Sequence, residues 1–238
     1  MKTKKKKLER IPTGIPNLDK LVEGGFIKKS TNLVSGDAGS GKTIFAIQFL
    51  IQGITKSNEP GIYITFEEKK EEFYQTMLSC GWDLEKLEKQ GKFIFLEYTP
   101  EQVKNVLLEG GGMIETAISK IKAKRLVIDS ISSFALLYTD ELKKQQAALN
   151  LFDLISKWGC TALLTAQGKP GGKNNGISTS LEFEVDSIIL LYHRKKQGIR
   201  KRAIEILKMR GTKIPEKTFE LAINNKGIFI NPRKTVSF

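Results

Sequence analysis

The segment Gly36-Asp37-Ala38-Gly39-Ser40-Gly41-Lys42-Thr43 constrains the fold of this chain more than any other part of it. The apolar run Ser30–Val34 precedes it and the helix-compatible run Ile44–Ile51 follows, so a strand, a Gly-rich turn and a helix come in succession. The glycines allow backbone N–H groups to turn around an anion, and the helix points its positive end at the same place. The pattern G-x-x-x-x-G-K-[ST] predicts a nucleotide phosphate site, with Lys42 at the β- and γ-phosphates and Thr43 on Mg²⁺.

Length and composition indicate one large α/β domain, although 238 residues leave room for two. The apolar content of 40% is sufficient for a core, and no run approaches the ~18 apolar residues of a membrane span. The basic N-terminus is followed by Leu8-Glu9-Arg10-Ile11-Pro12 and has no signal-peptide apolar region. We therefore expect a cytoplasmic protein with Cys80 and Cys160 reduced, and a single histidine, His193, makes a histidine-based metal site or triad improbable.

The formal net charge of +13 is concentrated in two segments. Residues 1–10 carry six basic residues against one acidic residue, and we expect them to form a flexible tail ahead of a single domain over 11–238. Residues 194–213 carry nine basic residues against Glu205 alone, and those at 194–202 form a cluster. Such segments are compatible with a nucleic acid or an acidic protein partner, and equally with a solvated lysine-rich surface.

Apolar patterning predicts alternating strands and helices in the first two thirds of the chain. After the phosphate-binding loop and its helix, the predicted strands are Ile62–Phe66, Phe93–Leu96, Leu126–Ile128 and Thr161–Thr165, and the predicted helices are Glu67–Leu78, Met113–Ile121 and 141–158. A short helix is expected near Pro16 and a loop over Gly168–Thr179. Four β segments without helices follow, at Val185–Tyr192, Ala203–Lys208, Thr218–Ile223 and Gly227–Ile230. The predicted fold is a mostly parallel α/β sheet with a C-terminal antiparallel β extension.

Three carboxylates follow predicted strands, where ligand sites of open α/β sheets gather. Asp129 ends the buried run Leu126–Ile128, and we expect it to hold Mg²⁺ through water beside Thr43. Glu67 and Glu68 follow Ile62–Phe66. One of the pair is suited to orient water at a γ-phosphate while the other holds a basic neighbour. The alternative is that both are N-terminal helix acids that complement the helix dipole.

Two further sites are less specific. Gln167 follows the strand Thr161–Thr165, where an amide can sense a γ-phosphate or simply end a strand. Lys208 and Arg210 lie two residues apart in a predicted strand segment, hence on one face. Such cations can neutralise transition-state charge within the chain or from a neighbouring subunit, and can equally belong to an exposed basic strand.

Taken together, these residues resemble the KaiC-like branch of the RecA-type ATPases over about residues 11–231. The motifs that carry the resemblance are Thr13-Gly-Ile-Pro-Asn-Leu-Asp19 with Gly24-Gly25, the loop 36–43, Phe66-Glu67-Glu68, Ile128-Asp129-Ser130, Glu182-Phe183-Glu184-Val185-Asp186 and Lys208-Met209-Arg210-Gly211-Thr212. The Glu67-Glu68 pair and the segment 208–212 are specific to that branch.

The resemblance implies a RecA-like core with ATP bound between the subunits of a ring, typically a homohexamer. It implies that Glu67 and Glu68 are the catalytic carboxylates, with Lys42, and that Lys208 and Arg210 reach the γ-phosphate of the neighbouring subunit. The clock protein of this family has two such domains, whereas this chain has one. Where the clock protein has an adjacent Ser-Thr pair, this chain has Glu182-Phe183, so autophosphorylation there is not expected.

Three functions remain open at this point. The first is a ring-forming ATPase that couples slow hydrolysis to partner binding. The second is a nucleic-acid-binding recombination or repair ATPase, favoured by the basic segments but lacking an aromatic residue in 168–179 to stack on bases. The third is a nucleotide sensor without hydrolysis, against which the Glu67-Glu68 pair argues.

Overall fold

The computed structural model describes residues 8–99, 101–102, 105–106, 112–135, 137–168, 184–196 and 198–237. Several expectations lie outside these residues, namely those for residues 1–7 of the tail, for 169–179 of the predicted loop and for Glu182-Phe183.

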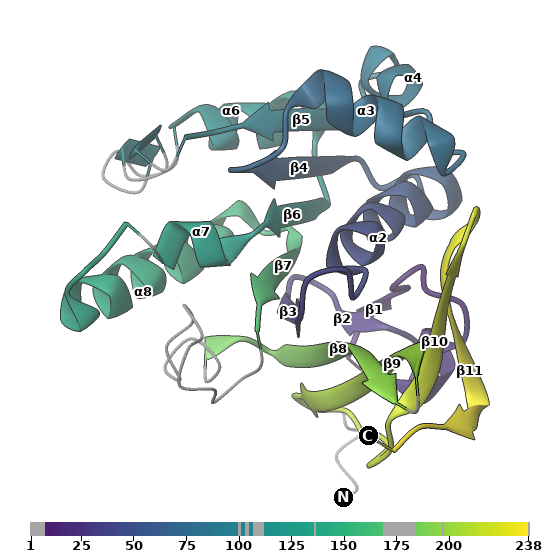
Figure 1. Cartoon of the computed structure of the whole chain (residues 1–238). Helices are drawn as coiled ribbons and strands as arrows, with labels where there is room; N and C mark the ends of the chain where they lie inside the picture. The colour runs from purple at the N-terminus through teal and green to yellow at the C-terminus, as the bar shows by residue number, and fades with distance from the viewer. Residues whose placement is uncertain are drawn as a thin grey trace, which may run out of the picture.

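A nine-stranded sheet organises the chain, in the order β11-β10-β9-β8-β3-β7-β6-β4-β5 (Figure 1). The six strands from β8 to β5 in that order are mutually parallel, and β9, β10 and β11 extend the sheet antiparallel beyond β8. The strands are β3 (Thr31–Gly36), β4 (Gly61–Thr65), β5 (Phe93–Glu97), β6 (Arg125–Asp129), β7 (Thr161–Gln167), β8 (Ser187–Lys196), β9 (Ile199–Met209), β10 (Phe219–Asn224) and β11 (Gly227–Thr235). This arrangement confirms the predicted fold class.

Helices cover both faces of the parallel part of the sheet (Figure 1). Those on one face are α2 (Lys42–Ser57), α3 (Lys70–Ser79) and α4 (Leu84–Lys89), and those on the other are α6 (Gly112–Ile121), α7 (Ile131–Ala135) and α8 (Glu141–Trp158). Strands buried on both faces read as continuous apolar runs, because every side chain meets one helix layer or the other. Along β6, for example, Val127 faces the core under α2, while Leu126 and Ile128 face the core under α8.

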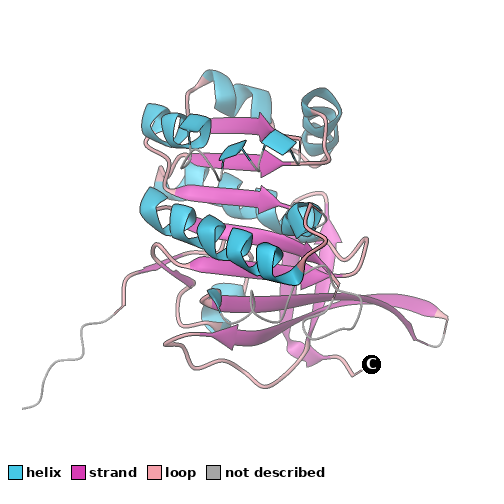
Figure 2. Cartoon of the chain, turned by 90° about the vertical axis from the view of Figure 1, so that its left-hand side faces the viewer, coloured by secondary structure: helices cyan, strands magenta, loops and turns pink. Residues whose placement is uncertain are grey.

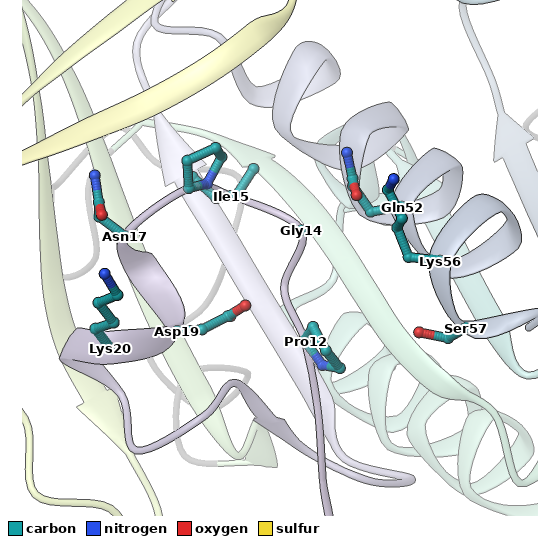
Figure 3. Close-up of a pocket in the computed structure, with 10 residues that line it drawn as sticks. Pro12, Gly14, Ile15, Asn17, Asp19, Lys20, Gln52, Lys56 and Ser57 are labelled. Carbon is teal, nitrogen blue, oxygen red and sulfur yellow. The ribbon is translucent and has the colours of Figure 1, made fainter.

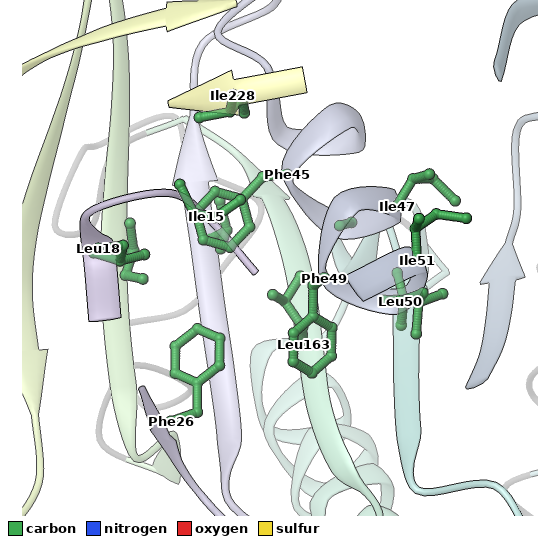
Figure 4. Close-up of a cluster of buried hydrophobic side chains, with 14 of the residues drawn as sticks. Ile15, Leu18, Phe26, Phe45, Ile47, Phe49, Leu50, Ile51, Leu163 and Ile228 are labelled. Atoms are coloured by element: carbon green, nitrogen blue, oxygen red, sulfur yellow. The ribbon is translucent and has the colours of Figure 1, made fainter. Parts of the chain in front are cut away.

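The core under α2 also fixes the N-terminal segment, which contains β1 (Arg10–Ile11), α1 (Leu18–Leu21) and β2 (Phe26–Ile27). Phe49 of α2 packs edge-on against Phe26 with ring centroids 5.8 Å apart, and Leu18 and Ile15 lie in the same cluster (Figure 4). Burying an aromatic side chain contributes roughly 1.5–3 kcal/mol. The apolar residues of α2 therefore hold the helix, and with it the loop at its N-terminus, in place.

Two predicted boundaries are wrong. The helix expected from Glu67 begins at Lys70, because the Thr65 hydroxyl accepts hydrogen bonds from the backbone N–H groups of Glu67 and Glu68 and holds both in a turn. Strand β9 ends at Met209, and Arg210 lies in the following turn, so Lys208 and Arg210 do not share one strand face. The patterning also missed β1, β2 and the short helices α4 and α7.

Candidate functional site

The loop 36–43 connects the end of β3 to the start of α2, as the sequence predicted. Gly39 and Gly41 have φ angles of 71° and 105°, which L-residues with a Cβ rarely adopt. A Cβ on Gly36 would lie 2.2 Å from the Leu191 carbonyl oxygen of β8. The Ser40 hydroxyl inside the loop is buried and has no hydrogen-bond partner among the described residues. The loop is thus a tight backbone cradle with one unsatisfied buried donor, which suits an anion.

Lys42 folds back over this cradle. Its Nζ donates to the carbonyl oxygens of Gly36 at 2.9 Å and Asp37 at 3.1 Å. Burial lowers the pKa of Lys42, while the carboxylates of Asp129, Asp37 and Glu67 oppose that shift. A desolvated ammonium held by neutral carbonyl groups gains strongly from a negatively charged ligand.

Asp129 at the end of β6 is the polar centre of the site. Its Oδ2 accepts hydrogen bonds from Thr43 Oγ1 at 2.8 Å and from the Tyr63 hydroxyl at 2.7 Å, and its Oδ1 accepts one from Thr165. The structure thus joins Thr43 and Asp129, which the sequence analysis expected to act together. Tyr63 and Thr165 were missed because both occupy positions that read as ordinary strand residues. Burial and the Asp129 charge raise the pKa of Tyr63, so this hydroxyl is a permanent donor.

The Glu67-Glu68 pair follows β4, next to β6 in the sheet. The Ser133 hydroxyl of α7 donates to Glu67, rather than the basic neighbour that was expected. The side chain of Glu68 accepts no hydrogen bond from the described residues, and its pKa is raised by burial and by the charges of Asp129, Glu67 and Glu72. Because α3 begins after them, at Lys70, the two carboxylates are not residues of its first turn.

Gln167 ends β7 directly beside the start of the loop, since it pairs in register with Gly36. Its backbone N–H donates to the Ser132 hydroxyl at 2.8 Å, and its side chain is exposed. The helix α7 therefore supplies Ser132 to Gln167 and Ser133 to Glu67. The serine-rich run Ser130-Ile131-Ser132-Ser133, directly after Asp129, is the sequence signal that could have indicated these two serine contacts.

Lys208 and Arg210 lie away from the loop of their own chain. Gly36 pairs with Leu191 in the middle of β8, whereas Lys208 pairs with Ile188, near the N-terminal end of that strand. Lys208 Nζ donates to the Val185 carbonyl oxygen at 2.7 Å, and Arg210 forms an exposed ion pair with Asp186 at 3.4 Å. The structure does not bring these two cations to the phosphate-binding loop within one chain.

Two basic residues of the β8–β9 hairpin contact the loop instead. Arg202 Nε donates to the Gly39 carbonyl oxygen at 3.1 Å. His193 lies beside the loop, since a Cβ on Gly39 would be 3.3 Å from His193 Nδ1. Burial, Arg202 and Arg200 lower the pKa of His193. The sequence placed Arg202 in the basic cluster at 194–202 and predicted no role for His193.

The motif Thr13-Gly-Ile-Pro-Asn-Leu-Asp19 lies at the other end of α2, beside a pocket of about 360 Å³ (Figure 3). Thr13 donates to Asp19 Oδ1 from its backbone at 2.8 Å and from its hydroxyl at 2.7 Å. Asp19 points from α1 toward α2, and its pKa is raised by burial, against the two hydrogen bonds from Thr13 and the Arg125 charge. The motif closes the N-terminal segment onto α2.

Arg125 anchors the same end of α2 from β6. Its guanidinium is fully buried, donates to the carbonyl oxygens of Phe49 at 2.8 Å and Pro12 at 3.0 Å, and forms an ion pair with Glu59 at 2.7 Å. It also stacks over the Phe49 ring at 4.5 Å. A Cβ on Gly53 would lie 2.2 Å from Arg125 Nε, so a glycine is needed where this side chain crosses α2.

A family model described as "ATPase: KaiC" matches residues 11–235. The chain belongs to the KaiC ATPase family. A UPF0273 protein of Methanocaldococcus jannaschii is 34% identical over 96% of this chain and 99% of its own length. The crystal structure of a KaiC-like protein from Pyrococcus horikoshii matches with a TM-score of 0.84 and 37% identity, over 95% of this chain and all of that one. The α/β sheet with its antiparallel extension is therefore the KaiC-like form of the RecA fold.

The circadian clock proteins of the family are longer. The clock oscillator protein KaiC of Thermostichus vulcanus is 35% identical over 94% of this chain, which spans only 44% of that protein. This KaiC-family chain thus corresponds to about half of its clock relatives. In the part of the chain that the structure describes, no helix has the length and apolar character needed to cross a membrane.

Proposed function

We propose that this KaiC-family chain binds and hydrolyses ATP with Mg²⁺, as one ATPase domain over residues 11–238 that follows the basic tail 1–10. The observation that carries the proposal is the arrangement at the loop 36–43. There a backbone cradle and Lys42 lie next to the Thr43–Asp129 pair, and the carboxylates of Glu67 and Glu68 lie at the end of the adjoining strand. Phosphate binding needs the backbone cradle and Lys42, and hydrolysis needs the carboxylates of Glu67 and Glu68.

The oxygen atoms around Asp129 fit Mg²⁺. The metal prefers carboxylate, hydroxyl and water oxygens, and Thr43 and Asp129 place a hydroxyl and a carboxylate 2.8 Å apart. Thr43 would hold it directly and Asp129 through water. When bound, Mg²⁺ would neutralise charge on the phosphates. The hydroxyls of Tyr63 and Thr165 donate to the Asp129 carboxylate and orient it.

The two glutamates have different roles in this proposal. Ser133 fixes Glu67, which makes it the orienting member of the pair. Glu68 has a raised pKa and no hydrogen-bond donor among the described residues, so it is the better acceptor for a proton of the attacking water. Lys42 stabilises the charge that develops on the transferred phosphoryl group. Gln167, beside Gly36, reports the presence of the γ-phosphate to the segment that follows β7.

Assembly completes the site in this proposal. Lys208 lies toward the edge of the sheet opposite its own loop and Arg210 follows it in a turn, so in this proposal a second copy presents both to the nucleotide. A closed ring, with a homohexamer as the expected size, repeats that contact at every interface. Nucleotide state then governs how the subunits contact one another and a cytoplasmic partner.

The test compares Glu67→Gln and Glu68→Gln with the unmodified protein. Both variants keep the shape of the site, so ATP affinity is expected to stay within about 3-fold while turnover falls by about 10²–10⁴-fold, the usual contribution of a general base. Glu68→Gln is expected to be the more severe of the two. Glu71→Gln, an exposed acid in the first turn of α3, is the matched control and should leave turnover unchanged.

Turnover that is unaffected in both variants would contradict the catalytic assignment and leave a nucleotide sensor. The same samples, examined by size-exclusion chromatography with light scattering and a non-hydrolysable ATP analogue, report the ring. A monomer with and without nucleotide would remove the role of Lys208 and Arg210 between subunits.

A further inference from the structure

The β8–β9 hairpin continues beyond the rest of the sheet as a two-stranded ribbon. Strand β8 pairs with β3 only over Ser187–Leu191, and β9 pairs with β10 only over Arg202–Ile204, among the residues that the structure describes. Beyond these points, 194–196 and 199–201 pair with each other alone among the described residues. Figure 2 shows two long strands that reach past the ends of the other strands. At the end of this ribbon, Lys195 and residues 198–201 are exposed to solvent in the part of the chain that the structure describes.

The ribbon places like charges directly opposite one another. Lys195 pairs in register with Arg200, and Arg194 pairs with Lys201. Lys195, Arg200 and Lys201 are exposed, and within the described parts of the chain none of these three forms an ion pair with a carboxylate. Like charges opposite each other destabilise a strand pair. Folding does not require this arrangement, whereas a polyanionic ligand would be bound by it.

Both faces of the ribbon are basic. Directly opposite residues of an antiparallel pair share a face, and neighbours along a strand alternate between faces. Lys195 and Arg200 therefore lie on one face, and Arg194 and Lys201 on the other. A membrane or an acidic protein surface would contact the cations on only one face of the ribbon. A groove with a phosphate backbone along each wall would contact the cations on both faces of the ribbon.

We propose that the β8–β9 ribbon is a binding arm for duplex DNA that enters the major groove and contacts phosphates on both sides. The major groove of B-form DNA is about 12 Å wide and admits a two-stranded β-ribbon. The corresponding groove of duplex RNA is deep and narrow and excludes side chains. Lysine and arginine contacts to phosphates carry no base readout, so the binding is independent of sequence.

The base of the ribbon is fixed to the nucleotide site. Arg202 donates to the Gly39 carbonyl oxygen at 3.1 Å, and His193 lies beside Gly39, where a Cβ on that glycine would be 3.3 Å from its Nδ1. These contacts orient the arm relative to the loop 36–43. The arm is nevertheless distinct from the groups proposed for hydrolysis, so DNA binding does not depend on turnover.

The test is a fluorescence anisotropy titration of a labelled DNA duplex with the full chain, at several salt concentrations. The variant Lys195→Ala/Arg200→Ala/Lys201→Ala removes three cations from the ribbon. The control Lys86→Ala/Lys120→Ala/Lys157→Ala removes three exposed lysines from α4, α6 and α8. Both carry the same net charge and keep residues 1–10, so a difference between them reports position rather than total charge.

The ribbon variant is expected to bind duplex DNA about 10–100-fold more weakly at low salt, and its slope of log K against log salt is expected to be smaller by about 2–3. The control is expected to bind within about 3-fold of the unmodified chain. Duplex RNA of the same sequence is expected to bind more weakly than DNA. The thermal midpoint of the ribbon variant should equal or exceed that of the unmodified chain, because repulsion between opposed cations is relieved.

Equal losses in the ribbon variant and the control would overturn the proposal, and so would unchanged binding by the ribbon variant. Duplex RNA that binds as tightly as DNA would exclude groove entry. Displacement of the duplex by polyglutamate at the same charge concentration would assign the ribbon to an acidic protein instead. If the triple variant folds poorly, Lys195→Gln and Lys201→Gln tested singly provide the same comparison on opposite faces.

Discussion

The two ends of α2 have opposite characters. At its N-terminus, the half-buried Lys42 donates only to neutral carbonyl groups, and the buried Ser40 hydroxyl has no hydrogen-bond partner among the described residues. At its C-terminus, Arg125 meets a carboxylate, two carbonyl groups and an aromatic ring. The same helix thus connects a polar site whose cation lacks an ion pair to a network in which the cation has a carboxylate partner, although Arg125 Nη2 itself makes no hydrogen bond among the described residues.

This difference indicates which buried charge serves stability and which serves binding. A buried cation that is paired with a carboxylate depends on that partner, and removing the cation leaves the carboxylate uncompensated. A desolvated cation without an anionic partner costs free energy until a ligand supplies one. Substitutions at each end of α2 test whether its C-terminal end determines stability and its N-terminal end determines ATP binding.

Arg125→Met is expected to have the largest effect. It leaves Glu59 and the carbonyl oxygens of Pro12 and Phe49 without their donor, and breaking a buried pair typically costs about 3–5 kcal/mol of unfolding free energy. Denaturant unfolding measures this loss. Lys124→Met, an exposed neighbour, is the control and should change stability by less than about 0.5 kcal/mol.

The double variant Arg125→Met/Glu59→Gln sharpens the first prediction. If the loss comes from an uncompensated carboxylate, removing that carboxylate should recover part of the unfolding free energy. An Arg125→Met variant as stable as the unmodified chain would show that the C-terminal end of α2 does not depend on this network.

Lys42→Ala is expected to affect binding and to spare stability. Losing a charge-assisted contact to phosphate is worth about 1.5–3 kcal/mol, so ATP affinity should fall by at least about 10–100-fold. The unfolding free energy should stay the same or rise, because a desolvated ammonium is removed. Lys56→Ala, at the other end of the same helix, is the control and should leave ATP affinity unchanged. If Lys42→Ala lowers the free energy of unfolding as much as Arg125→Met does, the two ends of α2 do not differ in their contribution to stability.

The smallest effect concerns the pH dependence of Asp19. Its pKa in the folded chain lies above the ordinary value of 3.8 because of burial, so the folded state binds this proton more tightly than the unfolded state. The resulting stabilisation is fully present below the ordinary pKa and is lost as pH rises through the raised value. Asp19→Asn should therefore cost more stability at acidic pH than at neutral pH, as urea unfolding at several pH values measures. A cost that grows with pH would contradict the assignment.

Much of the site was predictable because its residues follow strands. Thr43, Asp129 and Gln167 lie at the carboxyl ends of predicted parallel strands or in the loop, and parallel strands bring such ends to one edge. The predicted start of α3 was wrong because the Thr65 hydroxyl accepts hydrogen bonds from the backbone N–H groups of Glu67 and Glu68 and holds them in a turn. The helical periodicity of apolar residues contains no information about such a side-chain hydrogen bond. The helix α7 is only five residues long and left no periodic signal.

The sequence by itself determined the order of the longer strands and helices, the phosphate-binding loop and the presence of a basic segment at 194–202, because each depends on residues close together in the chain. Only the tertiary structure decided that Tyr63 and Thr165 converge on Asp129, that Lys208 and Arg210 lie away from their own loop, and that the basic residues of the ribbon oppose one another. Pairing partners and strand register depend on contacts between distant segments, which local patterning does not encode.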